Sequence, residues 1–265
     1  MTPGTDARGK RHPAALRGPW GERLASVAFW LVVWGLASRV IGSRIILVGP
    51  LEVAGRLVEL MGTREFWDSV ALSLLRIAAG FLAAVAAGVA CAALASRVRA
   101  VRALLAPVVG AVKAAPVASF VILVLLWVSS RELSVIISFL MAFPIVYTNV
   151  LEGIRQTDPQ LLEMADVFGV SGRARVRFVY AAQVLPYLRA ALSLALGLSW
   201  KSGIAAEVIG LPDLSIGEHL YDAKVYLATP DLFAWTAAVV LLSVGIEALV
   251  TRGLDALVAR WEARP

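Results

Sequence analysis

The sequence is poor in residues that bind metals or form disulfides. Its single cysteine, Cys91, lies inside an apolar run, which excludes an internal disulfide and a thiolate cluster. The two histidines, His12 and His219, are far apart in polar segments. We therefore expect neither a metal site nor any other resident cofactor.

Charged residues are also scarce. They make up 17% of the 265 residues, against about a quarter in soluble domains, whereas 59% of the residues are hydrophobic. This composition predicts an integral membrane protein, all-α, whose length suits one helical bundle of roughly six spans.

The sequence also lacks the patterns of an enzyme. It contains no G-x4-G-K-[ST] phosphate-binding loop, no nucleophile–base pair and no carboxylate dyad within an apolar run. We therefore do not expect an enzyme. If the protein moves a solute uphill, a partner subunit or an ion gradient must supply the energy.

Six apolar runs predict the spans: residues 24–41, 70–95, 104–128, 133–151, 188–210 and 232–250. The basic residues 1–23 predict a disordered cytoplasmic tail, and residues 251–265 a second cytoplasmic tail. A basic tail before an apolar run also suits a secretory signal, but no clear cleavage site ends the first run, which favours an uncleaved span. Residues 50–60 are amphipathic and predict a helix on the outer surface.

Basic residues are distributed unevenly about these spans. With both termini inside, fifteen of the 25 lysines and arginines lie on the inner side and six on the outer side. Cytoplasmic loops carry such an excess, so both termini are predicted to be cytoplasmic. The net charge of +6 is then a consequence of topology, and no nucleic acid is expected as a partner.

The longest polar insert, residues 158–186, falls between the fourth and fifth spans and therefore in the cytoplasm. Asp158 and Pro159 predict a helix start, and Gly169 ends the apolar periodicity that follows. A second short helix is predicted after Ser171. Its basic residues are Arg173, Arg175 and Arg177. We interpret them as anchors to anionic lipid in preference to contacts with an ATPase.

This insert resembles the E-A-A-x3-G signature of permease subunits in bacterial ABC importers, the binding-protein-dependent transport inner-membrane components. Glu163, Met164, Ala165 and Gly169 carry the likeness, with methionine in the middle of the triplet. A Leu-Pro pair common in one branch of the family follows as Leu185 and Pro186. The resemblance implies that these residues form the coupling element seated on a cytoplasmic ATPase.

Further motifs are similar to those of the nitrate/sulfonate/taurine group of these permeases, and the likeness extends over about residues 47–261, with the importer core at about residues 66–250. The motifs begin at Leu47 and Ser73, span Pro116 to Trp127, and end with Trp200 and Glu207. The resemblance implies a multi-pass protein of the bacterial inner membrane. It also implies two ATPase subunits, a second permease copy and an extracytoplasmic substrate-binding protein as partners.

Two lysines fall in the central part of predicted spans. Lys113 lies roughly 13 Å into the third span and Lys201 roughly 20 Å along the fifth. A charge at that depth usually faces a protein interior or a watery path. We expect these lysines to line a pathway for a small anionic solute, with Pro116, Trp127, Trp200 and Glu207 as further candidates. The alternatives are a structural ion pair of Lys113 with Glu207, or snorkelling to the membrane surface.

Two other functions fit part of the pattern. A gradient-driven secondary transporter of a small solute would favour inverted repeats, and the sequence has no convincing repeat. A membrane enzyme would need a reactive constellation, and a scaffold would not need central lysines. The sequence does not name the solute.

Overall fold

The structure, a computed structural model, describes residues 19–262 and contains helices but no strand within that range. Five of the described helices are long and apolar enough to cross a membrane, or six crossings result if the bent pair α4–α5 counts as one. The predicted all-α bundle of about six spans is confirmed. The elements are α1 (Pro19–Ile41), α2 (Pro50–Met61), α3 (Arg64–Arg97), α4 (Arg99–Ala114), α5 (Val117–Val124), α6 (Ser130–Arg155), α7 (Pro159–Val167), α8 (Gly172–Arg175), the π-helical turn η2 (Val176–Tyr180), α9 (Ala181–Gly210), α10 (Ile216–Val225) and α11 (Thr229–Glu262).

The centre of the bundle is formed by α3, α6 and α9, with α6 packed against the other two. Small buried residues such as Ala84 and Ala195 lie beside Val146 and Tyr147 in its core. At the crossing of α3 and α6, a Cβ atom added to Gly80 would lie 2.1 Å from the carbonyl oxygen of Val135. Helices in a membrane pack by such close approach of small residues, because lipid provides no hydrophobic drive between them.

The third span differs from the sequence prediction. Residues 104–128 were expected to form one helix, but α4 and α5 meet at an angle of 108°. The break falls at Ala115, whose ψ of 142° is extended, and at Pro116, which caps α5. Proline disfavours helical geometry in the preceding residue and offers no N–H to continue the helix, which explains the bend.

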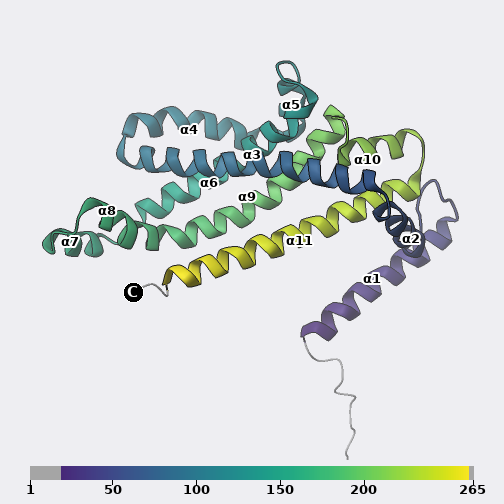
Figure 1. The fold of residues 1–265 in the computed structure, drawn as a ribbon, viewed down its shortest axis with the longest axis horizontal. Helices are drawn as coiled ribbons and strands as arrows, with labels where there is room; N and C mark the ends of the chain where they lie inside the picture. Colours follow the sequence, from purple (N-terminus) through teal and green to yellow (C-terminus); the bar gives the residue numbers. More distant parts are fainter. Residues whose placement is uncertain (1–18, 263–265) are drawn as a thin grey trace, which may run out of the picture.

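Figure 1 shows that α7, α8 and the end of α11 lie at one end of the bundle, whereas α2, α5 and α10 lie toward the other. A contact supports this arrangement: Arg131 at the start of α6 donates a 3.0 Å hydrogen bond to Asp213 in the α9–α10 loop. The pair α4–α5 therefore carries the chain from one end of the bundle to the other.

The helix α2 lies at the end opposite α7 and is fixed to the start of α11. Arg56 of α2 pairs with Asp231 of α11 and also with Glu59, at 2.8 Å. Hydrogen bonds to these two carboxylates raise the pKa of Arg56 above its ordinary value. The ion pair with Asp231 holds α2 against the start of α11 at this end of the bundle.

The chain termini bear on the predicted tails. Residues 1–18 of the predicted 1–23 tail lie outside the described residues, and α1 begins at Pro19. In the figure α1 lies beside the bundle, and its contact with the rest includes a 2.9 Å hydrogen bond from Trp34 Nε1 to the carbonyl of Val48. At the other end α11 continues as a helix through Glu262, so residues 251–262 of the predicted tail are helical, and residues 263–265 lie outside the described residues.

Candidate functional site

The polar stretch between α6 and α9 folds into two short helices around a glycine turn. The carboxylate of Asp158 accepts a 2.8 Å hydrogen bond from the backbone two residues on, and Pro159 takes the first helical position of α7. Gly169 has a φ of +61°, a left-handed conformation that glycine adopts without strain. This lets the N–H of Val170 reach the carbonyl of Ala165 at 2.9 Å, so α7 ends in a glycine cap.

The second helix is held against the first. Ser171 Oγ accepts a hydrogen bond of 3.4 Å from the N–H of Ala174, which starts α8, and the π-helical turn η2 continues directly into α9. Arg175 forms an ion pair with Asp166 of α7. The sequence did not reveal this pair, because the turn that brings α8 back onto α7 decides which charges meet.

The predicted coupling residues divide between the surface and the interior of this stretch. Glu163 and Met164 are exposed on α7, whereas Ala165 is buried and anchors the helix. Leu185 and Pro186 lie on α9, beyond η2, so they stand apart from α7 along the chain. The surface available to a partner therefore includes Glu163 and Met164.

Two apolar side chains that the motif does not include are more exposed than Met164, which is 49% exposed. Val167 is 83% exposed and Phe168 is 77% exposed, directly before the glycine turn. Exposed apolar residues that gather at one place mark a contact with another protein or with the membrane. An apolar pair inside a polar insert was the sequence signal that could have identified them.

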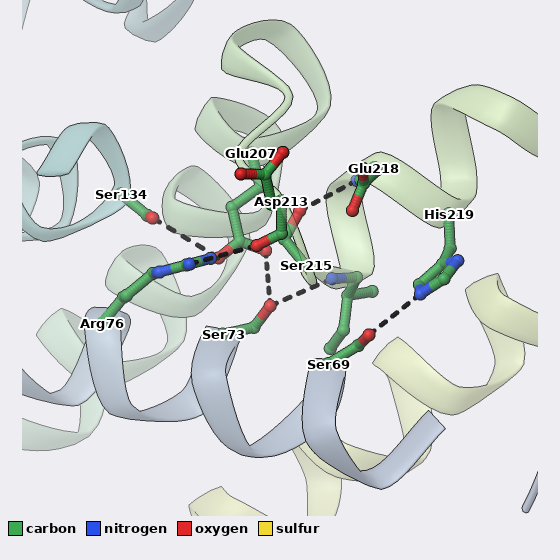
Figure 2. A network of polar contacts seen from close by, with 10 residues as sticks. Ser69, Ser73, Arg76, Ser134, Glu207, Asp213, Ser215, Glu218 and His219 are labelled. Carbon is green, nitrogen blue, oxygen red and sulfur yellow. Dashed lines mark hydrogen bonds and ion pairs between the residues drawn. The ribbon is translucent and has the colours of Figure 1, made fainter. Parts of the chain in front are cut away.

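At the opposite end of the bundle, Glu207 is buried with no exposed surface. Figure 2 shows the cluster around its carboxylate. Ser73 Oγ donates a 2.7 Å hydrogen bond to Oε2, and Ser134 Oγ donates a 3.4 Å hydrogen bond to Oε1. A buried charge must be paired and hydrogen-bonded to be tolerated, and this carboxylate draws its donors from both α3 and α6.

The counter-ion of Glu207 is Arg76 of α3. Arg76 Nη1 lies 3.9 Å from Glu207 Oε1, and the arginine side chain is only 14% exposed. Its Nη2 also donates a 3.2 Å hydrogen bond to the carbonyl of Asp213. Arg76 is therefore an interior residue of the bundle that does not snorkel to the surface, and it links α3 to the end of α9 and the loop that follows.

One face of α3 supplies most of the polar groups in this cluster. Ser69, Ser73 and Arg76 are spaced four and three residues apart, so they project from the same side of the helix. Ser69 Oγ lies 2.9 Å from His219 Nε2, and the His219 ring stacks on Trp235 with 4.6 Å between ring centroids.

The loop after α9 folds back onto Glu207. Ser73 Oγ accepts a 3.0 Å hydrogen bond from the N–H of Ile216, so the same hydroxyl joins Glu207 to the start of α10. A Cβ atom added to Gly217 would lie 2.3 Å from the Cβ of Glu207. The cluster thus fixes α3, α6, α9 and α10 to one another.

The two predicted pathway lysines lie on exposed surfaces of the single chain. Lys113 Nζ donates a 3.3 Å hydrogen bond to Thr148 Oγ1 of α6, and Lys201 is exposed on α9. Glu207 pairs with Arg76 and not with Lys113. In residues 191–210 of α9, the exposed residues lie four or three positions apart and form one stripe, which we call the α9 stripe: Leu194, Leu198, Lys201, Ala205 and Ile209.

The other predicted pathway residues are not gathered on that stripe. Trp200 is buried and donates a 3.3 Å hydrogen bond to the carbonyl of Val239 on α11. Trp127 is 72% exposed in the turn after α5, and Pro116 lies at the break between α4 and α5. These three residues have separate surroundings in the single chain.

Residues 80–263 match the family described as binding-protein-dependent transport system inner membrane component. Among curated proteins, the putative aliphatic sulfonates transport permease protein SsuC of Bacillus subtilis (strain 168) is 27% identical over 85% of this chain and 82% of its own. The taurine transport system permease protein TauC of Escherichia coli (strain K12) is 27% identical over 86% of this chain and 87% of its own. The riboflavin transport system permease protein RibX of Chloroflexus aurantiacus is 27% identical over 88% and 87%.

Among solved structures, the fold is similar to a chain in the crystal structure of a bacterial ABC transporter involved in the import of the acidic polysaccharide alginate. The TM-score is 0.60 and the sequence identity 14%, with 91% of this chain and 94% of that chain covered. At this identity the likeness concerns the fold alone.

Proposed function

Because the chain belongs to the family of binding-protein-dependent transport system inner membrane components, we propose that it forms the solute pathway of an ATP-driven importer and couples that pathway to a cytoplasmic ATPase. It is a multi-pass inner-membrane protein with helices long enough to span the bilayer. Its partners in this proposal are two ATPase subunits, a second copy of the chain and an extracytoplasmic substrate-binding protein.

The observation that carries the proposal is the paired-helix loop α7–α8. It combines the family-like residues Glu163 and Gly169 with the exposed apolar pair Val167 and Phe168 at one end of the bundle. The sequence has no phosphate-binding loop of its own, so ATP must act from another subunit. An apolar tip rimmed by polar residues suits a groove on that subunit.

The coupling in this proposal is mechanical. Closure of the two ATPases on ATP draws the α7 helices of the two copies together. Because α7 is tied to α8 by the Asp166–Arg175 pair and α8 continues through η2 into α9, the movement is passed to a spanning helix. The pathway between the copies then changes from inward-facing to outward-facing.

The α9 stripe is the surface that we propose lines this pathway. A lysine at the centre of a lipid-facing helix costs about 2.5–3.5 kcal/mol on insertion scales, so Lys201 favours a watery interface over lipid. A second copy facing this stripe would enclose such a space. Lys113 is a second candidate cation for the pathway.

We propose a small anion as the solute. SsuC and TauC are named for sulfonates and taurine. RibX has the same 27% identity to this chain and is named for riboflavin, so the likeness to these relatives leaves the solute open. The two lysines favour the anion. With taurine or an alkyl sulfonate as the probe, Lys113→Met and Lys201→Met should reduce uptake, and unchanged uptake by a stable, assembled complex would remove the argument.

The coupling proposal is tested by reconstituting the chain with its ATPase subunits and comparing Glu163→Ala and Gly169→Pro with the natural sequence. Proline cannot adopt the positive φ of Gly169, so the turn should be lost. Both variants should co-purify less ATPase or hydrolyse ATP without uptake. Gly172→Ala is the control, because a Cβ at that position meets nothing within 4 Å.

If both variants bind the ATPase and transport normally, the α7–α8 loop is not the coupling element. If no ATPase binds the natural chain at all, a gradient-driven transporter becomes the better account.

A further inference from the structure

A cavity of about 610 Å³ lies where α3, α6 and η2 meet, at the end of the bundle that carries α7. Its volume is within the range of about 300–1,000 Å³ that ligand sites occupy. Two arginines line it, and each is the last residue of a spanning helix: Arg97 ends α3 and Arg155 ends α6. The cavity therefore opens where two spans leave the apolar part of the membrane.

The two arginines lack internal counter-ions among the described residues. Arg56, Arg76, Arg131 and Arg175 each form an ion pair with a carboxylate, but neither Arg97 nor Arg155 does. Two unneutralised guanidinium groups in one cavity attract an anion. Arginine recognises phosphate oxygens through its planar fork of N–H donors.

The rest of the lining is mainly apolar and extends toward the centre of the span. Ala90, Ala93 and Leu94 lie in the last turns of α3, so the lining reaches about 10 Å back from Arg97 along the helix. Val176 and Tyr180 of η2 form the facing wall. An inorganic phosphate would gain nothing from this apolar surface, whereas an acyl chain would be stabilised by it.

We propose that this cavity binds an anionic phospholipid whose phosphate lies between Arg97 and Arg155. The part of an acyl chain nearest the headgroup then lies along Ala90, Ala93 and Leu94. Basic cavities between spanning helices are suited to such headgroups. The bound lipid bridges α3, α6 and η2, the turn that joins the α7–α8 loop to α9. The arginines on α8 and η2 are not among the residues that line the site, and its existence does not depend on the proposed transport function.

The test uses the full chain in detergent, titrated with phosphatidylglycerol and with phosphatidylcholine, and native mass spectrometry to count retained lipids. Arg97→Gln/Arg155→Gln should weaken phosphatidylglycerol retention by at least about tenfold, because it removes both guanidinium groups that would donate charge-assisted hydrogen bonds to the phosphate. Arg99→Gln/Arg102→Gln is the matched control, because it removes the same charge from residues that do not line the cavity. Ala93→Trp, which fills the cavity and keeps the charge, should abolish retention as well.

Equal losses in the two double variants would show that only general basic charge is involved and would overturn the site. Phosphatidylcholine retained as strongly as phosphatidylglycerol would overturn its preference for anionic lipid. Inorganic phosphate is the third arm: if millimolar phosphate displaces phosphatidylglycerol in the natural chain, the ligand is a free anion and the lipid assignment is wrong. Normal ATP-driven uptake by a variant that has lost lipid retention leaves the proposed function standing.

Discussion

At the scale of single residues, burial of the charged pair Glu207–Arg76 carries a large free-energy cost that neighbouring groups must offset. Removing a carboxylate and a guanidinium from water costs several kcal/mol per ion, and only close partners offset that cost. The serines of α3 and α6 serve Glu207, and the carbonyl of Asp213 serves Arg76. The cluster therefore depends on all its members being present together.

Glu207→Gln should be strongly destabilising for this reason. It keeps the side-chain volume but leaves the Arg76 charge without its counter-ion, and breaking one partner of a buried pair costs about 3–5 kcal/mol. The double variant Arg76→Met/Glu207→Gln should recover at least half of that loss, because no charge is left unpaired. Chemical denaturation in detergent micelles measures the three free energies of unfolding.

The matched control is Arg131→Gln, which breaks the ion pair between Arg131 and Asp213. The side chain of Arg131 is 71% exposed and that of Asp213 is 74% exposed. An exposed pair contributes at most about 1 kcal/mol. A Glu207→Gln variant as stable as Arg131→Gln would mean that the carboxylate does not compensate a buried cation.

At the scale of elements, α10 lies so close to the end of α9 that one position on it has room for no side chain. Gly217→Ala places a Cβ 2.3 Å from the Cβ of Glu207 and 2.4 Å from its carbonyl carbon, closer than such atoms approach. We expect α10 to be displaced, with a loss of about 1–3 kcal/mol in unfolding free energy. Hydrogen exchange of α10 amides should quicken, which locates the effect.

Gly245→Ala is the control for that substitution. Gly245 lies inside α11 with nothing within 4 Å of its added Cβ, so alanine should stabilise its helix by about 0.5–1 kcal/mol. Equal stability changes for the two alanine variants would contradict the close packing of α10 on α9.

The sequence predicted the helices and turns better than it predicted which side chains of different helices meet. The apolar runs and the glycine at position 169 are local signals, so the spans and the α7–α8 turn could be predicted. Pro116 is the local cause of the break between α4 and α5, but the angle of 108° between the two helices depends on how α5 packs. The partner of Glu207 could not be predicted, because the order of helices around the bundle decides which charge faces it.

At the scale of the whole molecule, α7 and the end of α11 lie opposite α2 and α10 across the bundle (Figure 1). The arrangement of the helices alone does not show which end faces the cytoplasm. The excess of basic residues at the α7 end indicates that this end is cytoplasmic, because translocated loops carry few basic residues. We therefore predict that the α7–α8 loop and both termini are cytoplasmic.

This orientation is tested with single cysteines in a Cys91→Ser background and a membrane-impermeant maleimide added to intact cells. Lys224→Cys on α10 and Ser130→Cys at the start of α6 should be labelled from outside. Gln160→Cys on α7 should react only after the membrane is permeabilised.

Ser130→Cys also tests the bent pair, because α4–α5 must cross the membrane for positions 99 and 130 to lie on opposite sides. Labelling of Arg99→Cys and Ser130→Cys under the same condition, both from outside or both only after permeabilisation, would make α4–α5 a re-entrant hairpin. Labelling of Gln160→Cys in intact cells would invert the molecule and remove the α7–α8 loop from the reach of any cytoplasmic ATPase.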